Sequence, residues 1–490
     1  MNPPRADPVD PHALARNARA LEAVARGLDP DGDARASMWG TVGDYVGDLA
    51  ERLAGMPAYS AAPVADPDRL ALTDAPGELS DALAVLDDVN EPGINQASGG
   101  HMAYIPGGGL FPSALADLVA DVSNRYSGVH FASPGANLME RALVRWMADL
   151  IGYPESAGGD LTSGGSVANL GAIVTARDAA GIRSRDVERA VVYLTAQAHH
   201  CIDKALRIAG LGDCVVRRVP MDRRWRMQPG ALADAVTADR AAGLNPWLVV
   251  ASAGTTNTGS VDPLAALADI ADANDLWLHA DAAYGGFFVL TDPGRRVLDG
   301  LDRSRTCVMD PHKGLFLPFG SGALLVRDVH ELAAAHRYSA SYLSDVRDAG
   351  GVFSPSDLSP ELSRPLRAPR LWLPLKVFGI EPFRAALEEK LLLARYFHAR
   401  LSAEPGWEVG PEPELSVVTY RHVPKQGDAN AFNRQLLDAV YADGRSVISG
   451  TELDGVYTLR LAVLHYRTHL DEVDGLLDVL VGAARRLAAE

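Results

Sequence analysis

The strongest constraint on this fold is a regular alternation of two kinds of segment from about residue 91 to residue 375. Short apolar runs, many of them β-branched, alternate with alanine-rich stretches of helical character. The clearest runs are residues 191–194, 247–250 and 276–278. Uninterrupted apolar runs of this length are typical of strands buried on both faces, and intervening helices indicate a mostly parallel sheet. The sequence therefore predicts an α/β fold whose ligands bind just beyond the carboxyl ends of the strands.

Two flanking regions complete the predicted organisation. Residues 1–90 show helical periodicity, whereas residues 376–490 combine long helical patterns with two strand-like runs. We expect an N-terminal helical segment over 1–90, a large domain over 91–375 and a smaller C-terminal α/β domain over 376–490.

The charge balance excludes several classes of partner. The chain has 46 Lys and Arg against 63 Asp and Glu, a net charge of −17, so an electrostatic footprint for nucleic acid or an anionic membrane is missing. No stretch approaches the roughly 18 apolar residues of a membrane-spanning helix. Cys201, Cys214 and Cys307 form no CxxC pair, so neither a disulfide framework nor a metal site is expected. We expect a soluble, cytoplasmic protein with a small-molecule partner.

Lys313 is the most informative single residue. It follows an apolar strand-like run, its neighbours are Pro, His and Gly, and a second apolar run follows. We expect such a lysine to be partly desolvated, which lowers its pKa and frees its amine for Schiff-base chemistry. Alone, the pattern also fits a structural lysine on a loop.

Asp281 supplies a second signal, because it ends the run that begins at residue 276. It precedes Lys313 by 313 − 281 = 32 residues, which accommodates one strand-helix-strand step and lets both side chains face one cleft. The alternative is that Asp281 and Lys313 form an ion pair with only a structural role. In the functional interpretation, Asp281 keeps the ring nitrogen of pyridoxal phosphate protonated while Lys313 forms the internal aldimine, so that the ring accepts electrons from the substrate.

Residues 161–170 suit a phosphate group. Gly164 and Gly165 let the backbone come close to an anion, and the amides and dipole of the alanine-rich helix that begins there favour negative charge. The stretch is neither a G-x-G-x-x-G nor a G-x-x-x-x-G-K-[ST] motif, which argues against dinucleotide and nucleoside triphosphate sites. A plain helix cap is the alternative.

Two further segments follow strand-like runs. His199 comes after residues 191–194, and Thr255 comes after residues 247–250. An imidazole at a strand end can lie flat on an aromatic ring, and a threonine hydroxyl can reach the exocyclic groups of that ring. We assign such a role to His199 rather than to His200, with a structural histidine as the alternative.

These motifs, in this order, resemble the group II pyridoxal-phosphate-dependent decarboxylases, which include aromatic L-amino acid, glutamate and related amino acid decarboxylases. The resemblance covers about residues 95–375. The segments that carry it are 111–112, 132–134, 162–170, 197–199, 254–256, 279–284 and 311–313.

The resemblance implies that Lys313 carries the cofactor, Asp281 pairs with the pyridine nitrogen and His199 stacks on the ring. The rest of the implied cofactor shell is Gly165 and Ser166 at the phosphate, with Thr255, Ala283 and His312.

The resemblance also implies an aminotransferase-like type I fold and an obligate homodimer in which the N-terminal helical segment wraps the partner subunit. Tyr104 and Pro106 fall where the family lines its substrate pocket, while Tyr126 and His130 fall where the other subunit contributes to that pocket. Because these positions are mixed aromatic and polar, an aromatic L-amino acid is the favoured substrate.

The implied reaction is decarboxylation of that amino acid to the amine and carbon dioxide. Oxidative decarboxylation to an aldehyde, another pyridoxal-phosphate reaction such as transamination, and a binding protein without catalysis are the alternatives. A carboxylate-gripping arginine would favour transamination, and Arg460 and Arg467 are the candidates.

The sequence departs from the family pattern at two places. Amine-forming relatives have a tyrosine in a mobile loop before the C-terminal domain, whereas residues 344–371 contain no tyrosine and one aromatic, Phe353; Tyr338 or Tyr342 are possible substitutes. Phenylalanine at that functional position marks the aldehyde-forming relatives. Asp310 stands where many relatives have asparagine, and its carboxylate would repel a phosphate unless it points away or pairs with an arginine.

Overall fold

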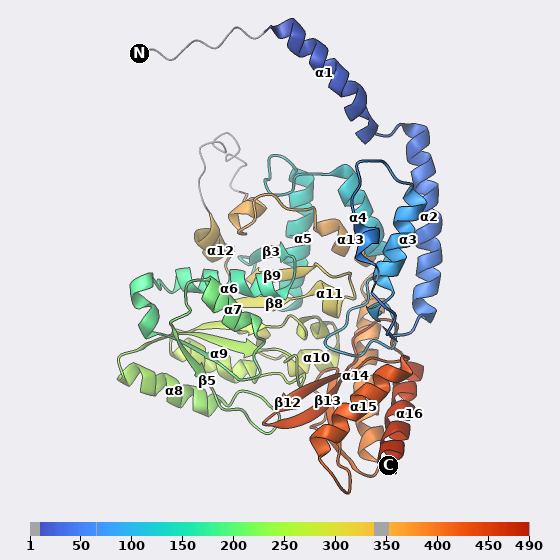
Figure 1. The fold of residues 1–490 in the computed structure, drawn as a ribbon. Coiled ribbons are helices and arrows are strands. Elements are labelled where there is room, and N and C mark those ends of the chain that lie inside the picture. The colour runs from blue at the N-terminus through green and yellow to red at the C-terminus, as the bar shows by residue number, and fades with distance from the viewer. Residues whose placement is uncertain (1–9, 65, 338–351, 490) are drawn as a thin grey trace, which may run out of the picture. The chain divides into compact units, whose positions relative to one another are not determined.

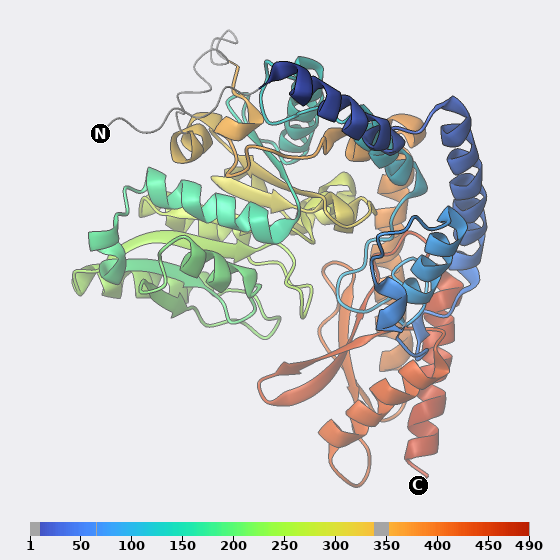
Figure 2. The same cartoon turned by 45° about the horizontal axis from the view of Figure 1, so that its top comes forward.

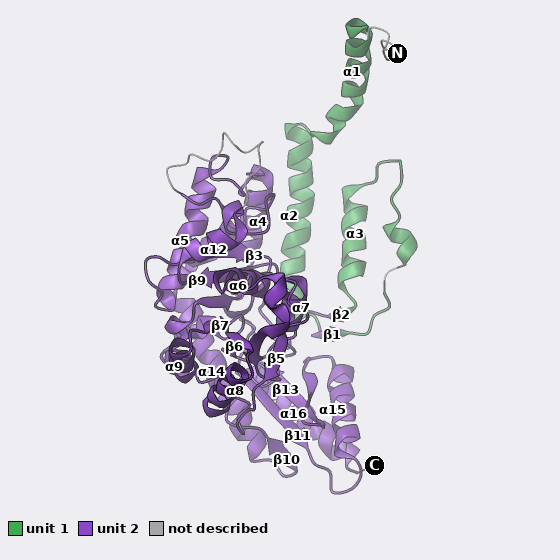
Figure 3. Cartoon of the chain, turned by 90° about the vertical axis from the view of Figure 1, so that its left-hand side faces the viewer, with its two compact units in different colours: residues 1–56, 60–93 green, residues 57–59, 94–490 purple. Residues whose placement is uncertain are grey.

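The computed structural model describes residues 10–64, 66–337 and 352–489 (Figure 1). Contacts divide the chain into two compact units, residues 1–56 with 60–93 and residues 57–59 with 94–490 (Figure 3). Among the described residues, no helix combines the length and the apolar character needed to cross a bilayer.

The first unit is helical. Its elements are α1 (Pro11–Ala25), η1 (Arg26–Leu28), α2 (Gly32–Gly55), η2 (Pro67–Leu70) and α3 (Leu79–Asn90). α2 begins where the carboxylate of Asp31 accepts a hydrogen bond of 2.8 Å from the amide of Ala34. Asp87 of α3 joins this helix to α2, since it accepts from the hydroxyl of Tyr45 at 2.9 Å and pairs with Arg52 at 3.2 Å.

The second unit contains a seven-stranded central sheet of order β3-β9-β8-β7-β6-β4-β5. The strands are β3 (Gly158–Thr162), β4 (Ala190–Leu194), β5 (Val215–Arg218), β6 (Asn245–Ser252), β7 (Trp277–Asp281), β8 (Thr306–Met309) and β9 (Gly322–Val326). Neighbours from β5 to β8 are parallel, whereas β9 is antiparallel to both β8 and β3. The predicted mostly parallel sheet is confirmed.

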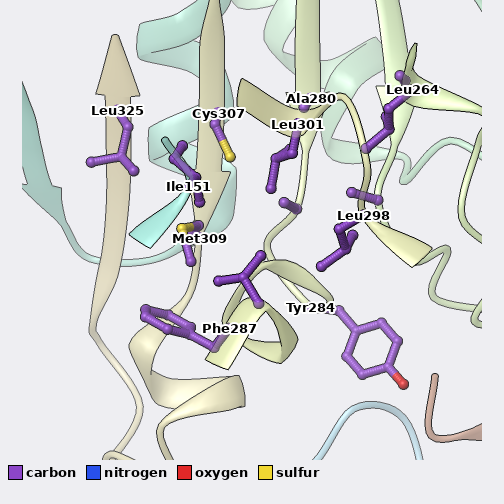
Figure 4. Packing of buried hydrophobic residues seen from close by; sticks show 14 of the residues in the cluster. Ile151, Leu264, Ala280, Tyr284, Phe287, Leu298, Leu301, Cys307, Met309 and Leu325 are labelled. Carbon is purple, nitrogen blue, oxygen red and sulfur yellow. The ribbon is translucent and has the colours of Figure 1, made fainter. Parts of the chain in front are cut away.

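Helices cover both faces of this sheet. They are α4 (Phe111–Ser123), α5 (Pro134–Leu150), α6 (Gly165–Ala179), α7 (Cys201–Ile208), α8 (Pro229–Ala241), α9 (Leu264–Ala273), α10 (Asp292–Val297), α11 (Pro311–Gly314), α12 (Val329–His336) and α13 (Ala368–Phe378), with the 3-10 turns η3 (Ser184–Arg189), η4 (Gly286–Leu290), η5 (Leu301–Arg303) and η7 (Pro355–Asp357). Alternate side chains of β4 enter different cores, which explains the uninterrupted apolar run of this strand. Val191 and Tyr193 pack with residues of α5, α8 and α9, whereas Val192 and Leu194 pack with residues of α6 and α7. Figure 4 shows part of the first core, where Ala280 and Cys307 of neighbouring strands lie near Leu301.

A second, antiparallel sheet of order β10-β11-β13-β12 follows near the C-terminus. Its strands are β10 (Trp407–Val409), β11 (Val417–His422), β12 (Ser449–Leu453) and β13 (Val456–Ala462), and the helices of this part are α14 (Glu381–Ser402), α15 (Ala429–Asp443) and α16 (Leu470–Leu487). The three helices and the inner faces of β11 and β13 share one apolar core. Figure 2 shows these elements in orange and red. Two-residue strands β1 (Tyr59–Ser60) and β2 (Gly93–Ile94) stand at the unit boundaries in the sequence.

Candidate active site

A cavity of about 240 Å³ lies where the strands of the central sheet end. Its walls come from the segments that follow β3, β4, β6, β7 and β8, as the strand-end argument predicts for an α/β sheet. The lining residues are Ser163, Gly164, Gly165, Ser166, Val167, Asn169, His199, Cys201, Ser252, Gly254, Thr255, Thr256, Asp281, Ala283, Tyr284, Asp310, His312 and Lys313. All eight residues expected to surround a cofactor are therefore brought together at one cavity.

Asp281 and Lys313 reach the cavity from adjacent parallel strands. Asp281 is the last residue of β7, and Lys313 lies in the single turn of α11 that follows β8. β7 and β8 pair in register, with Asp281 opposite Val308. The spacing argument for a shared cleft is correct, because parallel neighbours end at the same edge of the sheet.

Lys313 forms an ion pair with Asp310, and Nζ lies 2.9 Å from Oδ2. Burial alone lowers the pKa of Lys313, but the carboxylates of Asp310 and Asp281 outweigh burial, so the pKa is raised above its ordinary value. The predicted lowering is wrong, because the sequence argument counted desolvation and left out the neighbouring carboxylates. Asp310 therefore does pair with a cation, but with the lysine rather than with an arginine.

The ring of His312 is held by a hydrogen bond to a backbone carbonyl. Its Nδ1 lies 2.5 Å from the carbonyl oxygen of Ser321, and since a carbonyl only accepts, Nδ1 carries the hydrogen. Burial lowers the pKa of His312, so the ring is neutral at pH 7 and Nε2 is left with a lone pair. That Nε2 lies 3.8 Å from Oδ2 of Asp310.

His199 stands on the turn after β4. Its Nδ1 accepts a hydrogen bond of 3.3 Å from the amide of Cys201, which leaves the hydrogen of the neutral ring on Nε2. Burial lowers the pKa of His199, and the carboxylate of Asp281 opposes this effect only in part. His200 packs against His199 with ring centroids 4.2 Å apart, and of these two histidines only His199 lines the cavity.

The start of α6 meets the cavity with glycines. A Cβ added to Gly165 would lie 2.7 Å from Oδ2 of Asp310 and 3.2 Å from Cβ of Ala283, so a larger residue does not fit here. Gly164 has φ +153°, a conformation that other residues rarely adopt. Gly165 and Ser166, the first residues of this 15-residue helix, therefore bring its positive end to the cavity, next to the carboxylate of Asp310.

A hydrogen-bond network connects two lining residues of the cavity, Asn169 and Cys201, to His279 of β7. Nε2 of His279 lies 2.7 Å from Oδ1 of Asn169, whose amide donates to Sγ of Cys201 at 3.4 Å. Nδ1 of His279 therefore accepts from the hydroxyl of Thr306, at 2.9 Å, and this hydroxyl accepts from the indole of Trp277 at 3.0 Å. Burial lowers the pKa of His279 to about 4, which keeps the ring neutral and the network in one direction.

Several lining residues were not predicted from the sequence, among them Asn169, Cys201 and Tyr284. Asn169 lies one helical turn after Ser166, and Tyr284 lies three residues after Asp281. Because residues at such spacings can share one face, both could have been predicted to line the cavity from the positions of Ser166 and Asp281. The hydroxyl of Tyr284 is hydrogen-bonded to Ser416, with 2.7 Å between the hydroxyl oxygen and Oγ.

The four residues expected at the substrate lie outside this lining. Tyr104 and Tyr126 are exposed, Pro106 is buried, and His130 is half-buried with its amide bonded to Oγ of Ser354 at 3.0 Å. Tyr126 and His130 were expected to serve the other subunit, and all four roles stay predictions.

Arg460 and Arg467 are already engaged by the protein. Arg460 is buried in β13 and donates to Asn257 O at 3.2 Å, to Ser449 Oγ at 2.7 Å, to Tyr104 O at 2.9 Å and to Thr256 O. Arg467 donates to the carbonyl of Ala97 at 2.8 Å and stacks on Tyr466. Four of the five donors of Arg460 are thus satisfied within the chain.

The loop expected over residues 344–371 is described only from residue 352 onwards. Tyr338, Tyr342 and residues 344–351 lie outside the described residues. Phe353 is described, and its ring packs edge-on against His330 with centroids 5.4 Å apart, away from the cavity lining.

The cavity fits pyridoxal phosphate. It offers an amine for the aldehyde at Lys313, a carboxylate for the ring nitrogen at Asp281 and the start of α6 for the phosphate. Glycine at position 165 keeps the approach to the α6 amides open, since even a Cβ there meets Asp310 and Ala283.

Comparison with known proteins agrees with this site. The family model described as the pyridoxal-dependent decarboxylase conserved domain matches residues 68–423. An aromatic-L-amino-acid decarboxylase of Bacillus atrophaeus is 35% identical over 377 residues, which are 76% of this chain and 78% of that protein. A phenylacetaldehyde synthase of Arabidopsis thaliana is 30% identical over 438 residues, 86% of this chain and 89% of that protein.

A solved structure shows the same fold. The crystal structure of Oryza sativa TDC with PLP and tryptamine is similar with a TM-score of 0.88 and 26% identity, covering 94% of this chain and 99% of that one. Both the family model and the sequence relatives extend over most of the chain and include every segment that lines the cavity. The chain belongs to the pyridoxal-dependent decarboxylases, carboxy-lyases that use pyridoxal phosphate.

Proposed function

We propose that this enzyme removes the carboxyl group of an aromatic L-amino acid as carbon dioxide and releases the amine. The observation that carries the proposal is the convergence of Lys313, Asp281 and the start of α6 on one cavity. Relatives named for aromatic-L-amino-acid, tyrosine and tryptophan decarboxylation support the substrate class.

Each side chain has a distinct task in this proposal. Lys313 would attach the cofactor through Nζ, Asp281 would hold a proton on the ring nitrogen, and the neutral ring of His199 would contact the cofactor ring. The amides at Gly165 and Ser166 would bind the phosphate, with Thr255, Ala283 and His312 around them. When bound, pyridoxal phosphate supplies an electron-accepting ring that stabilises negative charge at the substrate Cα.

Proton transfer to Cα needs a donor at the cavity. Lys313 suits this task, because its raised pKa keeps a proton on Nζ at neutral pH. Tyr284 does not suit it, because its hydroxyl is engaged by Ser416, bonding to Oγ at 2.7 Å and accepting from the backbone amide at 2.7 Å.

The engagement of Arg460 supports decarboxylation over transamination. A transaminase keeps the substrate carboxylate in the plane of the cofactor and needs a free cation to hold it there. Four of the five donors of Arg460 are instead engaged by Tyr104, Thr256, Asn257 and Ser449. Without that grip, the bond to the carboxylate is free to stand perpendicular to the ring and break.

The test is a product analysis of the purified enzyme with a panel of L-amino acids. Tryptophan, tyrosine, dihydroxyphenylalanine or phenylalanine is expected to release carbon dioxide and amine without oxygen uptake. In Lys313→Ala, mass spectrometry after borohydride reduction is expected to find no attached cofactor, since the attaching amine is gone. Turnover restricted to acidic or basic amino acids would refute the aromatic assignment.

Formation of an aldehyde is the second candidate. It is supported by the absence of tyrosine from residues 344–371 and by the relative named phenylacetaldehyde synthase. The same assay separates the two reactions, because the aldehyde route consumes oxygen and yields peroxide and ammonia, whereas the amine route does neither.

We further propose that the enzyme is a homodimer with shared active sites. The outer face of α4 exposes Leu115, Val119 and Val122, the last 80% exposed, and Phe131 and Leu138 are exposed nearby in the sequence. Apolar side chains gathered in this way are typical of an interface. Residues 1–90 would be the dimerisation segment, residues 91–375 the cofactor domain and residues 376–490 the small domain; every residue of α1 is exposed or half-buried.

Subunit mixing tests the shared site. If His130 serves the partner's cavity, co-expressed His130→Ala and Lys313→Ala chains form hybrids with one intact site, and activity returns although each variant alone is inactive. No recovery in hybrids of confirmed 1:1 composition would refute the sharing, and a monomer by light scattering would refute the dimer.

We place the enzyme in the cytoplasm. Cys201, Cys214 and Cys307 are buried free thiols, which suits a reducing compartment. Cell fractionation with activity measurement is the test, and recovery of the activity with an extracellular fraction would contradict the placement.

A further inference from the structure

The proposed reaction leaves Asp310 without a task. This residue lies directly after β8 and is only 1% exposed. One carboxylate oxygen, Oδ2, is 2.9 Å from Nζ of Lys313, while the other, Oδ1, is buried and has no hydrogen-bond partner among the described residues. A buried carboxylate oxygen without a partner is costly, so its position calls for a reason.

The carboxylate also lies against the start of α6. A Cβ built on Gly165 would be 2.7 Å from Oδ2 and 3.2 Å from Oδ1, so both oxygens of Asp310 are next to the first residue of the helix. The N-terminal end of an α-helix attracts an anion. Asp310 therefore faces two positive groups at once, the ammonium of Lys313 and the start of α6.

A phosphate bound at the start of α6 would meet this carboxylate. With His199 and His312 neutral, the cavity holds one positive charge, on Lys313, and two negative charges, on Asp281 and Asp310. A phosphate monoester adds a charge of about −1.5 to −2. Like charges at such distances repel strongly because little water separates them.

We propose that Asp310 is an internal anion that pairs with Lys313 and competes with the cofactor phosphate for the start of α6. It neutralises both positive groups in the cofactor-free chain, and it lowers the affinity for a phosphate-bearing cofactor without lowering the affinity for the pyridine ring. This inference rests on the assignment of Lys313 and α6 to the cofactor in the proposed function.

The test compares two ligands that differ only in the phosphate. Dissociation constants for pyridoxal phosphate and for pyridoxal, which lacks the phosphate, are measured with the natural chain and with Asp310→Asn. Asparagine keeps the shape and removes the charge. We expect Asp310→Asn to bind pyridoxal phosphate at least about tenfold more tightly, and pyridoxal with less than about a threefold change.

A third probe and a control complete the design. Inorganic phosphate is expected to raise the unfolding temperature of cofactor-free Asp310→Asn more than that of the natural chain. Asp302→Asn removes the same charge from an exposed position and is expected to change neither ligand's affinity.

Each other outcome overturns the inference. Weaker binding of pyridoxal phosphate by Asp310→Asn would make Asp310 a phosphate ligand. If Asp310→Asn bound both ligands more tightly by the same factor, Asp310 would act through Lys313 alone. If both dissociation constants were unchanged, Asp310 would have no effect on cofactor binding.

Two measurements keep the test decisive. If Asp310→Asn does not fold, the two dissociation constants of the natural chain are compared instead. The inference requires that the natural chain bind pyridoxal phosphate less than about a hundredfold more tightly than pyridoxal. Cofactor trapped on the natural chain but not on Lys313→Ala confirms the lysine assignment independently, so failure of this inference is distinguishable from failure of the proposed function.

Discussion

The guanidinium of Arg460 donates a hydrogen bond of 2.9 Å to the backbone carbonyl of Tyr104, a residue 356 positions earlier in the chain. The same guanidinium holds Thr256 and Asn257, which follow the cavity-lining Thr255. Tyr104 has φ +55°, an uncommon conformation for a tyrosine, and its side chain is 55% exposed. One buried cation thus fixes the backbone of Tyr104 and one wall of the cavity together.

Arg460→Lys is expected to loosen both segments. Lysine presents its donors from a single point and cannot reach all four acceptors of the arginine, so the free energy of unfolding is expected to fall by about 2 kcal/mol. We expect KM to rise while borohydride trapping of the cofactor on Lys313 persists. Ser449→Ala removes one acceptor only and is expected to cost about 1 kcal/mol. An unchanged KM in Arg460→Lys would show that Arg460 acts on stability alone.

Asp281→Asn is expected to separate cofactor attachment from catalysis. Asparagine fills the same space but cannot stabilise a proton on the ring nitrogen, so kcat is expected to fall by at least about a hundredfold. Attachment of the cofactor to Lys313 should survive, because the amine is untouched. Mass spectrometry and turnover are measured on the same sample, with Asp203→Asn at an exposed position of α7 as the matched control. Retained turnover would remove Asp281 from the mechanism.

His101 is expected to make the fold sensitive to acid. Its side chain is 2% exposed, and neither ring nitrogen has a hydrogen-bond partner among the described residues. Burial lowers the pKa of His101 from 6.5 to about 4, so the unfolded chain binds more protons between these values. Stability contributed by the neutral ring is therefore present above about pH 6.5 and is lost as pH falls towards 4, by at most about 3 kcal/mol.

His101→Leu is the corresponding test. Leucine is expected to leave the unfolding temperature nearly unchanged at pH 8, because no hydrogen bond is lost. Between pH 6.5 and pH 5 the variant should lose less stability than the natural chain. Parallel pH profiles of the two proteins would contradict the assignment to this imidazole.

Arg364 is expected to be essential for stability. Its side chain is 0% exposed and pairs with Glu140 at 2.8 Å and with Asp160 at 2.5 Å. Burial raises the pKa of Glu140 to about 7, although Arg364 opposes this rise. Arg364→Met would leave two buried carboxyl groups without a cation and is expected to cost about 3–5 kcal/mol.

Glu140→Gln is the matched variant for that cluster. It keeps the shape and leaves Arg364 paired with Asp160, so it is expected to cost no more than about 1 kcal/mol. Denaturant unfolding of both variants distinguishes the cases, and similar losses would show that the charge of Arg364 is not what stabilises the cluster.

The sequence by itself determined where the cavity lies and which strand ends supply the residues expected around the cofactor. Apolar runs reveal the buried strands, and parallel neighbours end at one edge of the sheet, so the residues after each run must meet there. Lys313, Asp281, His199 and Thr255 were all located by this argument. It needs only local pattern and the geometry of parallel pairing, both of which a single sequence contains.

Only the tertiary structure decided how those residues are charged and held. Lys313 and Asp310 are three residues apart, yet the direction of the lysine pKa depends on whether their side chains turn towards each other. Arg460 reaches Tyr104 across most of the chain. Such contacts depend on how neighbouring side chains turn and on packing between distant segments, neither of which leaves a periodic trace in the sequence. In a buried site these contacts outweigh the desolvation that a sequence alone predicts.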